Sequence, residues 1–206
     1  MKVISQSTRA RIIEEFIENK PASLKPELHA MCGIPGSGKS TYVQQAINFG
    51  RFPEKAFLLN PDIVMEVLPE YHQSVKELGY EKAFEAWEMP TRAFAYELFG
   101  LAADKGLDII IDMGCVREED FKNISDLKQR GYTVHMYHVD CIPEVALDRI
   151  QDRDRHTPRS MVMERHQALK EMLPKYQDLA HHFYSFNNTD LAEPFMSQAP
   201  LYSEAL

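Results

Sequence analysis

The stretch from Gly33 to Thr41 has the residue types and the spacing of a phosphate-binding loop. It reads Gly-Ile-Pro-Gly-Ser-Gly-Lys-Ser-Thr and fits the pattern G-x-x-x-x-G-K-[ST]. In such a loop, glycines turn the backbone tightly and expose successive N–H groups to an anion. Lys39 would reach the β- and γ-phosphates of a nucleotide, and the Ser40 hydroxyl would ligate Mg²⁺. The sequence therefore predicts nucleotide contacts from Gly33, Ile34, Pro35, Gly36, Ser37, Gly38, Lys39, Ser40 and Thr41.

The segments on either side of this loop have the patterns that the motif requires. The apolar run Leu28–Cys32 predicts a strand before the loop, and residues Ser40–Phe49 predict a helix after it. The unpaired N–H groups and the positive dipole end of that helix would favour a bound anion. A glycine-rich turn without a ligand is the alternative, and the Lys-Ser pair favours the nucleotide site.

Two acidic residues follow predicted strands and are candidates for the chemistry of phosphoryl transfer. Asp62 comes after the strand at 56–60, where a carboxylate can accept the proton of an attacking hydroxyl. Its alternative role is to cap the helix that follows. Asp112 ends the apolar run 107–112 and would hold Mg²⁺ or orient the substrate, unless it is a solvated carboxylate at the end of the strand. Gly114 would let a substrate approach the backbone closely.

Arginines are concentrated between residues 149 and 165 of an otherwise acidic chain. An arginine supplied from this segment would neutralise charge on the transferred phosphoryl group. Arg149, Arg155 and Arg159 are the candidates, and a solvated helix face with i,i+4 ion pairs is the alternative. Arg92 and Glu97, on a predicted helix before the Asp112 strand, are candidates for substrate binding or for exposure on the helix surface.

Composition limits the function classes. The chain has 206 residues, of which 44% are hydrophobic and 26% charged, as expected for a soluble globular protein with one sizeable core. The net charge of −8 disfavours broad binding to nucleic acid or to anionic membranes. The three cysteines form no CxxC pair, which predicts reduced, buried thiols. No secretory signal or membrane span is visible, and we expect a cytoplasmic protein.

Strands and helices alternate along the chain, which predicts an α/β fold. Pro90 and Thr91 predict that one helix ends and another begins there. The pattern favours a P-loop NTPase or kinase fold, in which a parallel sheet of about five strands has helices on both faces and a helical lid segment. Predicted strands span 28–32, 56–60, 107–112, 133–139 and 183–186, and the main predicted helices span 5–19, 40–49, 62–68, 91–105, 118–130, 143–150 and 160–176.

Three regions are predicted along the sequence. Residues 1–26 form an amphipathic helix with a linker, residues 27–190 form the P-loop kinase domain, and residues 191–206 form a tail without a clear pattern. Ile12, Ile13, Phe16 and Ile17 make an apolar stripe on the N-terminal helix. That stripe would pack on the protein's own core or bind a partner protein.

With these residues in place, the chain resembles the zeta-toxin family of P-loop kinases from about residue 28 to residue 187. The order of several motifs carries the resemblance, since the phosphate-binding loop alone is shared by many kinases. The motifs are Gly33–Thr41, Leu58–Asp62, Gly106–Asp112, Leu127–Val134, Ala146–Arg149 and Arg155–Pro158.

The resemblance implies ATP- or GTP-dependent phosphorylation of a hydroxyl on a small molecule, with Mg²⁺. In zeta toxins the acceptor is a UDP-activated amino sugar, UDP-N-acetylglucosamine. The family's catalytic base maps to Asp62, and its strand-end acid maps to Asp112, where zeta toxins commonly carry Glu. Its two transition-state arginines map to Arg149 and to the Arg155/Arg159 stretch. Lys39 takes the role of the catalytic lysine. An antitoxin-like partner would bind the N-terminal helix.

The sequence is also compatible with two other functions. A similar Pro-Gly-Ser-Gly-Lys-Ser-Thr loop occurs in kinases that act on polynucleotide 5′-hydroxyls, although the net charge of −8 disfavours that acceptor. A nucleotide-binding switch is the other alternative. The run Asn187–Asp190 is faintly similar to a guanine-reading Asn-Lys-x-Asp motif but has no lysine.

Overall fold

The computed structural model describes residues 2–151, 157–189 and 201–203. The chain folds as two compact units that alternate along the sequence. Unit 1 comprises Met1–Leu24 and Lys55–Ile109, and unit 2 comprises Lys25–Glu54 and Ile110–Leu206. The predicted region boundaries at residues 26 and 190 stay a prediction. None of the helices in the described ranges has the length and apolarity of a bilayer-crossing segment.

Unit 1 is mainly helical. Its elements are α1 (Gln6–Ile13), the π-helical turn η1 (Glu14–Glu18), β2 (Phe57–Leu59), α3 (Pro61–Glu66), α4 (Pro69–Leu78) and α5 (Tyr80–Lys105). β2 joins the chain that leads into β3 (Ile109–Ile111), because the Phe57 N–H donates to the Asp108 carbonyl at 2.8 Å. Prolines at the first positions of α3 and α4 suit helix starts, since an N–H there has no partner within the helix.

The N-terminal helix packs within unit 1. Ile12 is fully buried and Ile17 is 4% exposed, and the Arg9 guanidinium lies 4.4 Å from the centre of the Phe94 ring. The Lys105 ammonium donates to the carbonyls of Ile17 and Glu18, at 2.9 and 2.7 Å, and so satisfies the end of η1. Part of the predicted apolar stripe is thus core. A partner protein bound to the rest of the helix stays a prediction.

Helix α5 runs without interruption through Pro90, and the prediction that a helix ends and restarts there is wrong. A proline removes one backbone hydrogen bond and crowds the preceding turn, yet tertiary packing can outweigh that cost. Trp87 and Phe94 are 2% and 1% exposed. They lie two turns apart on one face of the helix, one on each side of the proline. Burial of this shared face keeps α5 continuous.

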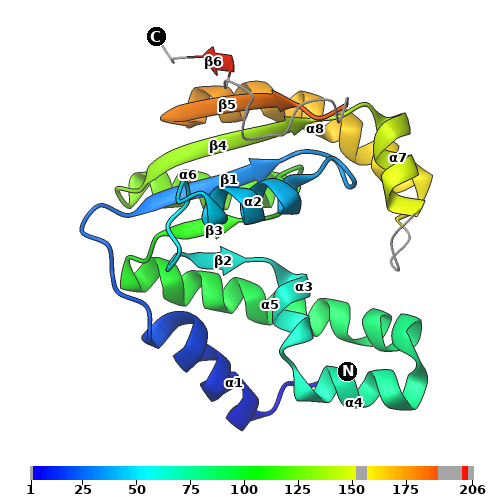
Figure 1. Ribbon diagram of the computed structural model, residues 1–206. Coiled ribbons are helices and arrows are strands. Elements are labelled where there is room, and N and C mark those ends of the chain that lie inside the picture. The colour runs from blue at the N-terminus through cyan, green and yellow to red at the C-terminus, as the bar shows by residue number, and fades with distance from the viewer. Residues whose placement is uncertain (1, 152–156, 190–200, 204–206) are drawn as a thin grey trace. The chain divides into compact units, whose positions relative to one another are not determined.

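Unit 2 carries a sheet wrapped by helices (Figure 1). Its elements are β1 (Glu27–Cys32), α2 (Lys39–Asn48), most of β3, α6 (Glu118–Gln129), β4 (Thr133–Asp140), α7 (Pro143–Gln151), α8 (Arg159–Leu179), β5 (His182–Asn187) and β6 (Leu201–Ser203). β1 and β5 each pair with β4 in parallel, and β6 pairs with β5 antiparallel. The α/β fold with a parallel sheet is confirmed. β6, in the tail, was not predicted.

A layer of aromatic rings covers one face of this sheet, on the side of α2. Tyr42 of α2 contacts the Tyr137 ring of β4, with centroids 5.7 Å apart. In-register pairing places His29, His135 and His182 side by side on β1, β4 and β5, and their rings stack at 4.8 and 4.7 Å. α6 and α8 contact β4 as well, and their Phe121 and Tyr176 rings touch at 5.6 Å.

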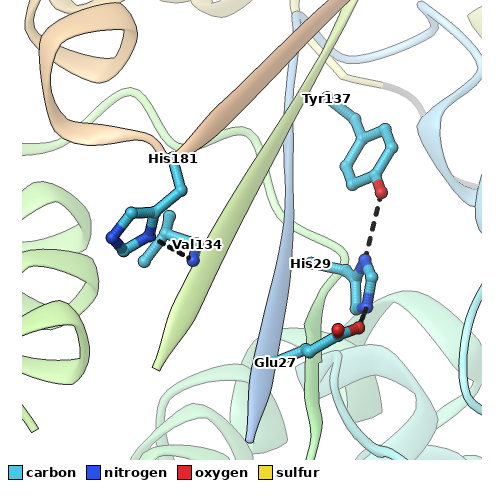
Figure 2. A network of polar contacts seen from close by, with 5 residues as sticks. All are labelled: Glu27, His29, Val134, Tyr137 and His181. Atoms are coloured by element: carbon cyan, nitrogen blue, oxygen red, sulfur yellow. Dashed lines mark hydrogen bonds and ion pairs between the residues drawn. The ribbon is translucent and has the colours of Figure 1, made fainter. Parts of the chain in front are cut away.

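His29 is the most buried of the three stacked histidines, at 3% exposure. Figure 2 shows it between two partners: Nδ1 lies 3.1 Å from the Tyr137 hydroxyl, and Nε2 lies 3.2 Å from a Glu27 carboxylate oxygen. Burial, with a smaller contribution from neighbouring His135, lowers the pKa of His29 from 6.5 to about 3. Nearby, the Val134 N–H donates to Nδ1 of His181 at 2.9 Å (Figure 2).

We predict that His29 makes the protein sensitive to acid. Its pKa is lower in the folded state than in the unfolded state, so the unfolded chain binds the extra proton between about pH 6.5 and pH 3. The contribution of neutral His29 to the free energy of unfolding is therefore fully present above about pH 6.5 and is lost as the pH decreases toward 3. Between pH 6 and 4.5, His29→Gln should reduce the slope of unfolding free energy against pH by about one proton, roughly 1.4 kcal/mol per pH unit. Denaturant titrations at each pH measure this slope.

The slopes of the wild type and of His29→Gln above pH 7 serve as the control for this experiment. Above pH 7 neither His29 nor the glutamine that replaces it changes protonation on unfolding, so the two slopes should coincide there. Equal slopes between pH 6 and 4.5 as well would show that His29 does not contribute.

Candidate active site

The phosphate-binding loop lies in unit 2, between the end of β1 and the start of α2. Gly33, Gly36 and Gly38 have φ angles of +154°, +81° and +99°, which favour glycine over residues with a side chain. Helix α2 begins at Lys39, as the sequence predicted to within one residue. The first N–H groups of α2 therefore follow directly on the glycine-rich turn, which is the arrangement that binds phosphate in P-loop proteins.

The backbones of α7 and β4 lie directly against the phosphate-binding loop. A Cβ atom placed on Gly36 would lie 2.3 Å from the carbonyl oxygen of Ala146. A Cβ on Gly33 would lie 2.7 Å from the Val139 carbonyl oxygen, at the end of β4. Main-chain atoms of β4 and α7 thus approach the loop so closely that only glycine fits at these two positions.

Lys39 is held over the loop. Its Nζ donates to the Ile34 carbonyl at 2.9 Å, so the side chain folds back on the turn from which it starts. Burial lowers the pKa of Lys39, and the negative charge of Asp112 acts in the opposite direction and favours the ammonium form. The predicted metal-binding acid and the predicted catalytic lysine are therefore electrostatic neighbours.

Asp112 directly follows β3 and is 9% exposed. Two residues later, the Gly114 carbonyl accepts the N–H of Gly33 at 3.3 Å, which joins the turn after β3 to the first residue of the phosphate loop. Cys115 has a φ of +50°, a left-handed conformation that is uncommon for a residue with a side chain. The backbone after β3 is thus closely fitted to the loop.

The three cysteines are free and buried, as predicted. Cys32 precedes the loop, and burial raises its pKa to about 12 although nearby Lys39 acts to lower it. The pKa values of Cys115 and Cys141 are also raised by burial. Since the thiolate is the reactive form, these side chains act as small apolar residues around the loop.

The predicted arginines differ in their surroundings. Arg149, in the last turn of α7, donates to Cys141 Sγ at 3.6 Å and to the Thr189 carbonyl at 3.5 Å. Arg159 is the exposed first residue of α8, and Arg155 lies outside the described residues. Arg165, which was not among the preferred candidates, is close enough for its charge to lower the pKa of Lys39. The only sequence feature that pointed to Arg165 was its position in the arginine-rich segment between residues 149 and 165.

Three predicted residues belong to unit 1. Asp62 is an exposed residue in the first turn of α3, and Asn60, whose Oδ1 accepts the Asp62 N–H at 3.0 Å, is the N-cap. The alternative capping role therefore belongs to Asn60. Arg92 is paired with Glu88 at 3.4 Å, and Glu97 is paired with Arg9, so both take part in ion pairs within the unit. Their binding of substrate stays a prediction.

Asn188, directly after β5, was not predicted to take part in the site. Its side chain is 4% exposed, and its Nδ2 donates to the Ser37 carbonyl of the phosphate loop at 2.7 Å. The sequence signal was its place in the run Asn187–Asp190, which resembled a guanine-reading motif only faintly.

Solved structures share this fold. A chain from the PezAT chromosomal toxin-antitoxin system of Streptococcus pneumoniae has a TM-score of 0.72 at 17% identity, with 98% of this chain and 84% of that chain covered. A chain of the AvrRxo1-ORF1:AvrRxo1-ORF2 complex with ATP has a TM-score of 0.60 at 16% identity, over 87% and 58%. A chain of the Pnkp1/Rnl/Hen1 RNA repair complex has a TM-score of 0.51 at 17% identity, over 77% and 48%. At these identities the likeness establishes the fold alone.

A comparison with curated proteins found no match. The family model described as Zeta toxin matches residues 13–182. This range includes the phosphate loop, Asp112 and the arginines of α7 and α8, and it extends over most of the chain. The protein therefore belongs to the zeta-toxin family.

Proposed function

We propose that the protein is an ATP-dependent kinase that transfers the γ-phosphoryl group to a hydroxyl of a small molecule. The observation that carries this proposal is the coupling of Lys39 to Asp112 beside a glycine-shaped loop at the start of α2. A lysine, a strand-end carboxylate and a helix N-terminus around one turn are the parts that P-loop enzymes use to bind and polarise a nucleotide. Membership of the zeta-toxin family supports the same reaction.

The residues of unit 2 have separate roles in this proposal. The loop N–H groups and the Lys39 ammonium bind the β- and γ-phosphates and stabilise the charge that develops during transfer. Arg149 leaves its contacts with Cys141 and Thr189 to neutralise the transferred group. Ser40 and Asp112 would hold Mg²⁺, which would neutralise negative charge on the phosphates. One hydroxyl and one buried carboxylate fit this ion, because Mg²⁺ takes few protein ligands beside phosphates and water.

Asp62 is the proposed general base, the role that the family resemblance gives it. The N-cap of α3 is Asn60, and Asp62 presents an exposed carboxylate in the first turn of the helix. UDP-N-acetylglucosamine is the first acceptor to test, because zeta toxins phosphorylate a UDP-activated amino sugar. Asp112 stands where zeta toxins commonly carry Glu, so a panel of other nucleotide sugars and polyols belongs in the same assay.

We predict that Asp62→Asn abolishes transfer while leaving nucleotide binding intact. Removal of a general base should lower kcat by about 10²–10⁴-fold, because the acceptor hydroxyl keeps its proton. The test measures product by mass spectrometry and the Kd of Mg²⁺-ATP by calorimetry. Glu66→Gln, which neutralises another exposed carboxylate of α3, is the matched control and should retain normal activity. Near-normal transfer by the Asp62→Asn variant would remove Asp62 from the mechanism.

Two related proposals concern the polymer alternative and a protein partner. A kinase acting on 5′-hydroxyl ends shares the phosphate loop and would show salt-dependent binding of single-stranded RNA or DNA. The net charge of −8 makes the small-molecule acceptor the better-supported proposal.

The AvrRxo1-ORF1:AvrRxo1-ORF2 complex and the PezAT system pair a protein of this fold with a second protein. We propose an antitoxin-like partner for this chain on that likeness.

A further inference from the structure

We infer that Asn188 is a positioning residue, whose side-chain amide fixes the orientation of the Ser37–Gly38 peptide in the phosphate-binding loop. The inference rests on the proposed function, since it gives Asn188 a role in nucleotide binding. All the residues that carry it belong to unit 2.

The backbone of Asn188 is itself held in place. Its N–H donates to the Asp140 carbonyl at 2.7 Å, which continues the parallel pairing of β4 and β5 one residue beyond the Asp140–Asn187 pair. The next residue, Thr189, accepts the Ile142 N–H at its hydroxyl, at 3.2 Å. Asn188 therefore projects from a rigid strand end, and its side chain has little freedom to move.

The contact with the loop requires a donor. The Ser37 carbonyl can only accept, so the Asn188 Nδ2, 2.7 Å away, must be the group that faces it. Asn188 is 4% exposed and Ser37 is fully buried. Without this amide the Ser37 carbonyl would be a buried acceptor that has lost its side-chain donor.

This hydrogen bond also determines where an N–H group points. In a trans peptide the C=O and N–H groups point in opposite directions, so holding the Ser37 carbonyl on Asn188 turns the Gly38 N–H away from Asn188. Gly38 has a φ of +99° and, as a glycine, offers little steric resistance to rotation of this peptide. Asn188 supplies the resistance that the loop's own residues do not. The Gly38 N–H thus stays available for a phosphate oxygen.

The test compares the same chemical change at adjacent positions. Asn188→Asp places a carboxylate oxygen against the Ser37 carbonyl and should weaken binding of Mg²⁺-ATP by about 10-fold or more. Asn187→Asp keeps the oxygen that accepts the Thr189 N–H at 2.9 Å, and its Kd should stay within about 2-fold of the wild type. Calorimetry well below the unfolding temperature gives both values, and Asn188→Ala, which removes the donor without adding a charge, should follow Asn188→Asp.

A second measurement separates positioning from stability. The ¹⁵N order parameter of the Gly38 amide in nucleotide-free protein, measured by NMR relaxation, should be lower in Asn188→Ala than in the wild type and unchanged in Asn187→Ala. If the Asn188 variants unfold more easily but bind Mg²⁺-ATP as the wild type does, the positioning role is wrong. If the wild-type protein binds no nucleotide, the proposed function fails. In that case equal Gly38 order parameters overturn the fixed peptide orientation, and a lower value in Asn188→Ala supports it.

Discussion

Replacement of Lys39 by alanine should abolish phosphoryl transfer without unfolding the protein. The Lys39 ammonium is hydrogen-bonded to the loop itself through the Ile34 carbonyl, and loss of a charged contact in the transition state typically lowers kcat by about 10³-fold. Burial lowers the pKa of Lys39, which means that the folded protein holds this charge at a cost. The Lys39→Ala variant should therefore unfold at the same temperature as the wild type or above it. Product formation and thermal unfolding measure the two effects.

Lys122→Ala is the matched control for this experiment. Lys122 is an exposed residue of α6 in the same unit, so its removal changes the net charge equally without touching the loop. We expect normal transfer from this variant. Transfer by Lys39→Ala at more than about a tenth of the wild-type rate would contradict the role of Lys39.

Replacement of Gly36 by alanine should remove nucleotide binding by distorting the loop. The added Cβ would lie 2.3 Å from the Ala146 carbonyl oxygen and 3.0 Å from its carbonyl carbon, and main-chain atoms of a helix cannot rotate away. Either α7 or the loop must move. We expect the free energy of unfolding to fall by about 2–4 kcal/mol and the affinity for Mg²⁺-ATP to fall by about 100-fold. Denaturant unfolding and calorimetry measure these changes.

Gly131→Ala separates the clash from the backbone strain. Gly131 has a φ of +91°, close to the +81° of Gly36, and no atom lies within 4 Å of the position of its added Cβ. Its replacement should cost only about 1–2 kcal/mol for the left-handed conformation and leave nucleotide affinity unchanged. If both alanine variants bound nucleotide equally well, contact between the loop and α7 would have no part in the site.

Local pattern was enough to predict the elements that form the site. The apolar run before the loop became β1, the three consecutive isoleucines became β3, and the glycines with Lys39 became the turn that starts α2. Each of these signals depends on neighbouring residues, whose spacing reports burial on one or both faces. Local signals were not enough at Pro90. The predicted break is wrong there because burial of Trp87 and Phe94, which keeps the helix continuous, involves parts of the chain far away in sequence.

Contacts between distant residues could not be predicted. The hydrogen bond from Asn188 to Ser37 joins positions 151 residues apart, and no periodicity reports such a pair. Likewise, nothing local distinguishes Arg165, which influences the pKa of Lys39, from the other arginines of the basic segment. Residue type indicated the chemistry of this segment, whereas only the packing of α8 selects the arginine that lies close to Lys39.

The supports of the phosphate loop have a consequence for synthesis of the protein. Gly33 meets the Val139 carbonyl, Gly36 meets the Ala146 carbonyl, and Ser37 is held by Asn188. All three supports are made on the ribosome long after the loop itself. A nascent chain that carries the complete motif therefore has no scaffold to shape it, and contacts of such long range form late in folding. Nucleotide binding should accordingly begin only when β5 has emerged, which makes it an indicator of completed folding.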